Sequence, residues 1–499
     1  MNKTTERHLK LTDINSIMSS ILRFIRANKT DAYLVGGAVR DACLKRTTED
    51  LDLIVSSSTQ DVGLELAKHL DGKCISLDAK RNIQRIVFGQ KSLTLDVSYL
   101  HQSEDVAGNL SRRDFTIDAM AISLNELSEQ SAAKVIDPTD GYSDLLKRSI
   151  RATSEATLRA DPVRILRGVR LSAQLDFSLE TKTITWMKKN NHLLSDISIE
   201  RVRDEILKIL ASSKITQSLY NLDSLGLLSI VIPELETCKN IEQPKEHSYD
   251  VFRHSLETPG MLELILSETN SHQRLLESVP RFEHWRNFFN EPLADGVSRS
   301  TMLRLAALLH DIAKPCTKTV DNDGRIRFLG HGPLGSEISR SIMSRLRFSR
   351  KATDYVSNLI KHHLRPSQVA PKGSIPSKRA VYRYYRDLGN VSVDTVYLNL
   401  ADYMAAKGDM ILKSSADLQD WQRHCKMAAD ILDNNQKYDP DIYHRIVNGY
   451  DLMSALALEP GPIVGKLICS ISEAHAAGDI NNRQEAIDFA RALIKNGNK

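Results

Sequence analysis

The segment that decides the fold is residues 32–55, AYLVGGAVRDACLKRTTEDLDLIV. Its apolar runs at 32–35 and 53–55 have the composition of short strands, and Gly36-Gly37 opens a helical stretch between them. Paired glycines let the backbone approach a ligand closely, and the first N–H groups of a helix favour a phosphate. A glycine pair is also typical of an ordinary tight turn, and by itself this pair favours the turn.

Acidic residues follow the glycine pair at strand spacing. Asp50 and Asp52 enter the apolar run LIV two residues apart, so their carboxylates point to one face of a strand. Asp96 lies inside LTLDVSY, where β propensity disfavours an aspartate. Three carboxylates on neighbouring strands suit Mg²⁺, and two such ions would activate an attacking hydroxyl and neutralise a leaving pyrophosphate. Arg40 lies one turn into the helix. Three acids after such a glycine pair favour a metal site over the alternative that each aspartate is an ordinary turn or cap residue.

The pattern along the chain changes near residue 150, which marks a domain boundary. Before it, short strands are predicted at 32–35, 50–55, 86–88 and 93–100, between helices such as 14–27 and 61–70. After it, apolar residues follow helical spacing almost without interruption. The sequence predicts an α+β fold, with a mixed-sheet head at 1–150, an all-α neck at 151–240, a helical domain at 241–410 and a helical tail at 411–499.

The composition bounds the class of protein. Of the 499 residues, 41% are hydrophobic and 26% are charged, as is typical of a globular chain. No segment approaches the roughly 18 consecutive apolar residues of a membrane span, and the N-terminus resembles neither a secretory signal nor a transit peptide, so we expect a cytoplasmic protein. The six cysteines form no CxxC pair, so neither a disulfide framework nor a cysteine zinc site is indicated. The formal charge of +4 is too small to indicate a polyanionic partner by itself.

Asp161 and Arg164 are three residues apart, a spacing that places both side chains on one helix face. On their Watson–Crick edges, cytosine and adenine present an amino donor beside a ring-nitrogen acceptor, whereas guanine and uracil present a carbonyl beside an N–H. Because Asp accepts and Arg donates hydrogen bonds, the pair matches C and A without a template. Asp161 followed by Pro162 is equally typical of a helix N-cap, and the residues alone leave the two interpretations even.

Histidines and aspartates interrupt four apolar helical segments in the second half of the chain. They are His254, His310, Asp311, His331, His362, His363 and Asp402. Any one of them alone is typical of a satisfied buried polar residue. As a set, each with a cost in burial, they indicate convergence on a divalent metal.

Two charged stretches also fit a simpler explanation than a binding site, namely a solvated helix surface. Residues 340–386 carry twelve basic residues, namely Arg340, Arg345, Arg347, Arg350, Lys351, Lys361, Arg365, Lys372, Lys378, Arg379, Arg383 and Arg386, with Tyr382, Tyr384 and Tyr385 among them. Basic groups interleaved with aromatic rings suit RNA, but a solvated helix face accounts for such runs equally well. The amphipathic helix predicted at 199–211 is expected to carry ordinary i,i+4 ion pairs and no chemistry.

Three blocks of the head resemble class II nucleotidyltransferases, the family of bacterial CCA-adding tRNA nucleotidyltransferases and bacterial poly(A) polymerases. They are GGAVRDACLKRTTEDLD at 36–52, RRDFTIDAMA at 112–121 and DPTDGYSDLLKRSIRA at 137–152, followed by RADPVRILRGVRLSAQLDF at 159–177. The resemblance implies Asp50 and Asp52 as metal ligands and Asp96 as a third acid. It implies nucleotide contacts from Gly36, Gly37, Arg40, Arg112, Arg113, Asp114, Asp118, Asp161, Arg164 and Arg167.

The resemblance also bears on the open alternatives. It favours base reading by Asp161 and Arg164, which match the EDxxR motif of the family, although Ala160 replaces its Glu. A second departure is Asp118, where the family usually has Asn; an acid there lacks the amide donor for a contact to the nucleotide sugar.

The histidine and aspartate set resembles the HD-domain phosphohydrolases. The resemblance implies that His254, His310, Asp311 and Asp402 bind a divalent transition metal or Mg²⁺, and that His331, His362 and His363 bind a second ion or a substrate phosphate. The implied reaction is metal-assisted hydrolysis of a phosphate ester, such as a 2′,3′-cyclic phosphate or a nucleotide. The tail, DLMSALALEPGPIVGKLICSISEAHAAGDINNRQEA, is similar to the C-terminal segment of HD-containing members of the polymerase family.

The predicted function is an RNA 3′-end nucleotidyltransferase that adds CMP and AMP to tRNA, with Mg²⁺, CTP and ATP. One alternative is a poly(A) polymerase or an enzyme that adds only part of CCA. An alternative of another class makes the HD centre the main activity and the head an RNA-binding module. Neither a membrane nor an obligate protein partner is indicated.

Overall fold

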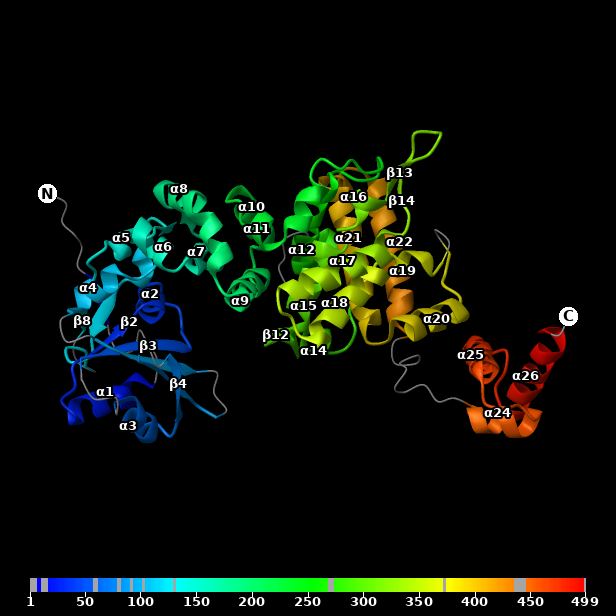
Figure 1. The fold of residues 1–499 in the computed structure, drawn as a ribbon, viewed down its shortest axis with the longest axis horizontal. Coiled ribbons are helices and arrows are strands. Elements are labelled where there is room, and N and C mark those ends of the chain that lie inside the picture. Colours follow the sequence, from blue (N-terminus) through cyan, green and yellow to red (C-terminus); the bar gives the residue numbers. More distant parts are fainter. Residues whose placement is uncertain are drawn as a thin grey trace. The chain divides into compact units, whose positions relative to one another are not determined.

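The computed structural model describes residues 7–9, 17–56, 62–78, 82–89, 93–100, 104–128, 132–267, 273–370, 374–434 and 446–497. It divides into two compact units, Met1–Glu205 with Asn221–Ile230, and Ile206–Tyr220 with Val231–Lys499 (Figure 1). The predicted boundaries at residues 150, 240 and 410 fall inside these units and stay predictions. Among the described helices, none has the length and apolar character needed to cross a membrane.

The head is built on an eight-stranded sheet with the order β1-β8-β7-β2-β3-β6-β5-β4. Its strands are β1 (His8–Leu9), β2 (Ala32–Val35), β3 (Asp50–Val55), β4 (Lys73–Asp78), β5 (Ile83–Val87), β6 (Thr94–Tyr99), β7 (Ala121–Ser123) and β8 (Ala133–Ile136). Because β3 and β6 are parallel and the other pairs antiparallel, the predicted mixed sheet is confirmed. In Figure 1, α1 (Met18–Ala27) and α3 (Val62–His69) lie on one side of this sheet and α2 (Gly37–Cys43) on the other.

The strands match the sequence prediction where apolar residues mark them. β2 and β3 have the predicted bounds, whereas β5 begins before residue 86 and β4 was not predicted. β4 leaves Ile75 and Leu77 exposed at the end of the sheet, so burial does not mark one of its faces. Residues 14–16 and 61 of the predicted helices lie outside the described residues.

Helices follow the sheet along the chain. They are α4 (Val106–Ser111), η2 (Thr116–Asp118), α5 (Gly141–Leu146), α6 (Glu155–Ala160), α7 (Val163–Leu175), α8 (Thr181–Asn190), η3 (Asn191–Asp196), α9 (Ile199–Leu210), α10 (Ile215–Ser224) and α11 (Leu228–Val231), with a small pair of strands β9 (Ser149–Ile150) and β10 (Ser178–Leu179). α7 buries Ile165, Leu166 and Val169, as its apolar spacing predicted. Its half-buried arginines at positions 164, 167 and 170 share the other face.

The second unit is almost entirely helical. Its elements are η4 (Pro233–Cys238), α12 (Val251–Ile265), α13 (Gln273–Leu276), α14 (Trp285–Asn290), β11 (Pro292–Ala294), β12 (Val297–Ser298), α15 (Arg299–Leu309), α16 (Lys314–Thr317), β13 (Lys318–Val320), β14 (Ile326–Phe328), α17 (His331–Arg345), α18 (Arg350–His362), α19 (Arg365–Gln368), α20 (Lys378–Leu388), η5 (Gly389–Val391), α21 (Ser392–Lys407), η6 (Gly408–Leu412) and α22 (Ser415–Leu432). α21 is buried on nearly all sides and packs against α12, α15 and α22. The α+β fold with a helical remainder is therefore confirmed.

The end of the chain has an apolar core of its own. α24 (Gly449–Leu456), α25 (Pro462–Ala477) and α26 (Arg483–Gly497) enclose Leu452, Leu467 and Ile471. α25 also contacts α20, because Arg383 and Arg386 of α20 form ion pairs with Glu473 of α25.

These contacts revise the interpretation of the basic stretch. Tyr382, Tyr384 and Tyr385 are buried in the helical core, so their rings are not available for stacking on bases. Of the two interpretations left open for this stretch, base stacking on these three rings does not hold, because the helix turns its aromatic face inward. Lys372 of that stretch lies outside the described residues.

A glycine sets how closely α5 approaches η2. A Cβ atom on Gly141 would overlap the carbonyl oxygen of Thr116, which is backbone and cannot turn away. We expect Gly141→Ala to destabilise the head by about 1–3 kcal/mol, the usual cost of overpacking. Thermal unfolding followed by circular dichroism measures this, with Gly89→Ala as control because a Cβ there meets no atom within 4 Å. Equal stability of the two variants would contradict the prediction.

Candidate active site and metal centre

The three acids of the head lie on one face of the sheet. Asp52 of β3 is directly opposite Asp96 of β6, and Asp50 is opposite Thr94, whose hydroxyl donates a hydrogen bond to Asp50 at 2.6 Å. Strand alternation explains this, because the intervening Leu51 is buried on the other face. The acids do not form a closed cluster: within the described residues, the groups of three potential metal ligands within 4.8 Å all lie in the second unit.

Asp96 already has a cationic partner. Arg85 of β5 donates from Nε and Nη2 to the two oxygens of Asp96, each at 2.7 Å. The sequence reasoning missed Arg85, whose one signal was a charged residue in a short apolar run. The assignment of Asp96 as a third metal acid stays a prediction.

Gly36, the first of the two glycines, is favoured by its backbone conformation and by the crowding around it. Gly36 has φ +73°, and a Cβ there would lie 2.7 Å from Arg113 Nη1 and 3.0 Å from Asp52 Oδ2. A side chain at this position would therefore force apart the groups that face the acids. The N–H of Gly36 donates to the Met120 carbonyl at 3.1 Å and is not available to a phosphate, which corrects the expectation for this amide. Gly37 begins α2, as predicted.

Asp52 lacks enough positive charge nearby. Burial raises its pKa, the charge of Asp96 adds to the rise, and the charge of Arg113 opposes it. A carboxylate whose ionised form is disfavoured in this way gains from a cation. The position of Asp52, beside Asp50 on the same strand face, thus fits a divalent ion held by these two residues.

A chain of alternating charges connects α2, η2 and α7. Arg40 of α2 contacts Asp118 at 2.6 Å, and Arg167 of α7 contacts Asp114 at 2.6 Å and Asp118 at 3.4 Å. Burial alone would raise the pKa of Asp118, but the charges of Arg40 and Arg167 outweigh it and lower the pKa. The acid that replaces the family's Asn therefore holds two of the predicted nucleotide-contacting arginines in place.

Arg112 and Arg113 differ in their exposure. Arg112 is exposed and pairs with Glu104. Arg113 reaches toward Gly36, and its backbone carbonyl accepts a hydrogen bond from the Thr153 hydroxyl. Their positions at the end of α4 leave one guanidinium at the surface and one beside Asp52.

The base-reading pair is arranged differently from the prediction. Asp161 precedes α7 rather than lying in it, because its φ of −147° is extended, and its carbonyl accepts the Arg164 N–H at 3.0 Å. The two side chains therefore do not share a helix face. The side chain of Asp161 does not cap α7 either, since it pairs with Arg201 of α9 at 2.8 Å. Its other oxygen, Oδ1, is buried with no hydrogen-bond partner in the described residues.

Arg164 is held by backbone. Its Nη1 donates to the carbonyls of Arg112 at 3.2 Å and Thr157 at 3.1 Å. Nearly two turns further along α7, Arg170 pairs with Glu205 of α9 at 2.7 Å. The charged face of α9 thus also pairs with Asp161 and Arg170, contacts that the expectation of ordinary i,i+4 pairs did not include.

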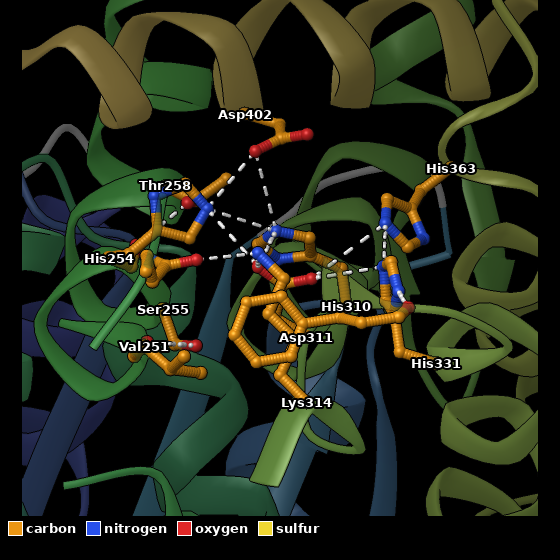
Figure 2. Close-up of polar contacts among 12 residues, drawn as sticks. Val251, His254, Ser255, Thr258, His310, Asp311, Lys314, His331, His363 and Asp402 are labelled. Atoms are coloured by element: carbon orange, nitrogen blue, oxygen red, sulfur yellow. Dashed lines mark hydrogen bonds and ion pairs between the residues drawn. The ribbon is translucent and has the colours of Figure 1, made fainter. Parts of the chain in front are cut away.

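A second site forms from histidines and aspartates of the second unit (Figure 2). His254 lies in α12, His310 and Asp311 follow α15, and Asp402 lies in α21. His254 Nε2 lies 3.2 Å from His310 Nε2 and 3.0 Å from Asp402 Oδ1, and His310 Nε2 lies 3.2 Å from Asp311 Oδ2. The four residues that the HD resemblance groups together therefore meet in space.

A neighbouring group shares Asp311. His331 begins α17 and His363 follows α18; their Nε2 atoms are 3.1 Å apart and lie 3.4 and 3.8 Å from Asp311 Oδ1. Each oxygen of Asp311 thus faces one group, as Figure 2 shows. In the described residues, His362 lies outside both groups of converging ligands, which corrects the expectation that it joins His331 and His363. Consecutive residues on a helix do not face the same side.

Backbone carbonyls orient three of the rings. The Nδ1 atoms donate to carbonyls three residues earlier, His310 to Ala307 at 2.8 Å, His331 to Phe328 at 2.6 Å and His363 to Ile360 at 2.7 Å. Since a carbonyl only accepts, the proton is on Nδ1, and a neutral ring turns the Nε2 lone pair into the cluster. This second-sphere arrangement is typical of metal-binding histidines.

The charges of the cluster also fit a metal. Burial disfavours protonated His310, but Asp311 and Asp402 outweigh it and raise its pKa to about 10. Burial and the charge of His310 lower the pKa of His363 to about 3. A proton is thus drawn to the ring beside the two carboxylates, where a divalent cation would satisfy the same negative charge. The buried nitrogen and oxygen donors suit such an ion.

A cavity of about 480 Å³ opens beside Asp311, His331, His363 and Asp402. Its lining includes cations that were not predicted, Lys314, Arg325, Arg327 and Lys407. Lys314 Nζ lies 2.6 Å from Asp311 Oδ2, and its signal in the sequence was a cation three residues after Asp311. The volume accommodates a ligand of nucleotide size, and the cations favour an anion.

Family models match most of the chain. The poly(A) polymerase head domain matches residues 32–151, and a model described as the RNA- and SrmB-binding site of polymerase A matches 176–239. The HD domain matches 251–407, and tRNA nucleotidyltransferase domain 2 matches 334–490.

Similar proteins cover nearly the whole chain. The A-adding tRNA nucleotidyltransferase of Deinococcus radiodurans is 30% identical over 92% of this chain and 95% of its own length. The CC-adding tRNA nucleotidyltransferase of Thermus thermophilus is 28% identical over 92% and 93%. Among solved structures, the Bacillus stearothermophilus CCA-adding enzyme in complex with CTP has a TM-score of 0.63 at 20% identity, covering 97% of this chain and 100% of its own, which shows a common fold. The chain therefore belongs to the tRNA nucleotidyltransferases that carry a poly(A) polymerase-type head and an HD domain, and it is a nucleotidyltransferase.

Proposed function

We propose that the head adds C and A nucleotides to the 3′ end of tRNA, with CTP and ATP as substrates. The 3′ oxygen of the RNA attacks the α-phosphorus of the nucleotide, and pyrophosphate leaves. The observation that carries this proposal is the row of carboxylates, Asp50, Asp52 and Asp96, on one sheet face beside Gly36 and the arginine cluster. Relatives with the names A-adding, CC-adding and CCA-adding support it.

Each part of the head has a role in this reaction. Asp50 and Asp52 would hold Mg²⁺, which when bound activates the attacking hydroxyl and neutralises the leaving pyrophosphate. Arg113, which faces the acids, would bind the triphosphate, since a guanidinium matches phosphate oxygens. Arg40 and Arg167, held by the buried Asp118, would line the nucleotide position without losing order when no nucleotide is present.

Base selection would use Asp161 with its unpartnered Oδ1. Arg201 holds Oδ2, so Oδ1 is the acceptor left for an amino group of cytosine or adenine. Arg164 would donate to the ring nitrogen from Nη2, while the carbonyls of Arg112 and Thr157 hold its Nη1. A buried acceptor without a donor is costly, and a matching base removes that cost.

A second proposed activity is phosphate-ester hydrolysis at the HD cluster. The two ligand groups that share Asp311, and the cavity with four cations beside them, support it. His254, His310, Asp311 and Asp402 would hold one divalent ion, and His331 and His363 with Asp311 a second. Such ions polarise a phosphoryl oxygen and lower the pKa of bound water. A 2′,3′-cyclic phosphate or a nucleotide fits the charge and the volume.

An extension assay tests whether the chain adds all three nucleotides of CCA. We expect the purified chain to convert tRNA lacking its last three nucleotides into product ending in CCA when CTP and ATP are both present. The product is sequenced at its 3′ end after reaction with each nucleotide separately and with both. Addition of CC alone, of A alone to tRNA ending in CC, or of a run of A would instead establish the partial-addition or poly(A) alternative.

Removal of the proposed base reader should relax selection. In Asp161→Ala, discrimination against U and G should fall about tenfold or more, because a matched base edge contributes about 1–3 kcal/mol. Single-nucleotide incorporation rates with each of the four triphosphates measure this. The control is Asp204→Ala, which removes an exposed acid of α9 that contacts Arg203 and not Asp161. An unchanged nucleotide preference in Asp161→Ala would refute the role.

Each of the two proposed activities should be lost without the other. We expect the double change Asp50→Ala and Asp52→Ala to abolish nucleotide addition and to leave phosphate release at the HD site, because the pair touches only the head. Asp311→Asn should do the reverse, since it removes a carboxylate charge from both HD groups. Both activities are measured on each full-length variant, with a chelator control that abolishes both. Loss of both activities in either variant would contradict independent centres.

A further inference from the structure

The geometry points to Arg85 as a built-in counter-cation of the head acids, which occupies Asp96 when no metal is bound and gives it up when a divalent ion binds. In this role Arg85 is a positioning residue that sets the metal affinity of the site. The inference rests on the proposed metal site at Asp50 and Asp52.

The register places these residues in one row. Asp52 of β3 lies opposite Asp96 of β6, and Asp96 lies opposite Arg85 of β5. Directly opposite residues of neighbouring strands point to the same face, about 4.5–5.5 Å apart at Cβ. The guanidinium is therefore on the acidic face, one strand beyond the site where Asp50 and Asp52 would hold an ion.

Arg85 binds Asp96 through two parallel hydrogen bonds. Both oxygens of Asp96 accept hydrogen bonds from Arg85 at 2.7 Å, so the guanidinium occupies one lone pair on each oxygen and its positive charge opposes a second cation there. The pKa of Arg85 is raised, chiefly by its hydrogen bonds to Asp96, and the charges of Asp50 and Asp52 contribute. All three acids thus act on the one guanidinium.

The pair is also accessible enough to exchange. The side chains of Arg85 and Asp96 are 37% and 22% exposed, so separating them does not require the sheet to open. Ion pairs with this degree of exposure contribute little net stability, whereas a divalent ion has twice the charge of a guanidinium. The same three carboxylates can therefore exchange one cation for the other.

Manganese binding tests this without reference to activity. The full-length chain with Asp311→Asn, which removes the residue that both HD groups share, is titrated with Mn²⁺ and followed by electron paramagnetic resonance. The same chain with Asp50→Ala and Asp52→Ala gives the signal that does not come from the head. We expect Arg85→Gln in this background to bind Mn²⁺ about five- to tenfold more tightly, because a competing positive charge is removed. Arg85→Lys keeps the charge and should fall between the two. The matched control is Arg23→Gln, which removes an arginine on α1 that bonds to Ser20.

The outcomes separate this inference from the proposed site. Unchanged or weaker Mn²⁺ binding in both Arg85 variants, with folding intact by circular dichroism, overturns it and leaves a static structural pair. If Arg85→Gln fails to fold, Arg85→Lys decides alone. The double change Asp50→Ala and Asp52→Ala in the same background should abolish head binding; retained binding there contradicts the proposed metal site itself, whatever Arg85 does.

Discussion

The buried carboxylate of Asp118 is the constraint on which the head depends. An ionised group removed from water is costly unless cations and hydrogen bonds replace the lost solvation, and breaking such a pair costs several kcal/mol. Arg40 and Arg167 provide that compensation from two different helices, at 2.6 and 3.4 Å. Because both must reach one point, α2 after the glycines and α7 after Asp161 are held against η2. These ion pairs thus fix the two arginines that are proposed to contact the nucleotide.

The HD cluster compensates a buried carboxylate in a different way. Asp311 is also buried, but its neighbours are four histidines and Lys314, and three of the histidines donate their Nδ1 protons to the backbone. Lys314 compensates part of the negative charge of Asp311 and Asp402, and the raised pKa of His310 shows that a further positive charge is favoured. In the head, Asp118 is paired with Arg40 and Arg167. In the HD cluster, the carboxylates and the Nε2 atoms of the histidines converge on one another.

The sequence predicted the features that repeat along a short stretch of chain. The strands β2 and β3, the placement of Asp50 and Asp52 on one face, and the apolar face of α7 all follow from local periodicity. The prediction failed where neighbours from elsewhere decide the outcome. Asp161 is turned out of its helix by a proline and by Arg201 of α9, and the tyrosines of α20 are buried by packing that composition does not reveal.

By itself, the sequence determined the mixed-sheet head, the helical remainder, and the residue types from which both sites are built. Only the tertiary structure decided the partners: Arg85 for Asp96, Arg201 for Asp161, His363 rather than His362 for His331. The physical reason is range. Backbone alternation and helix periodicity act over a few residues and can be seen in a line of sequence, whereas the pairing of buried charges depends on strand order and helix packing that bring together residues 11 to 40 positions apart.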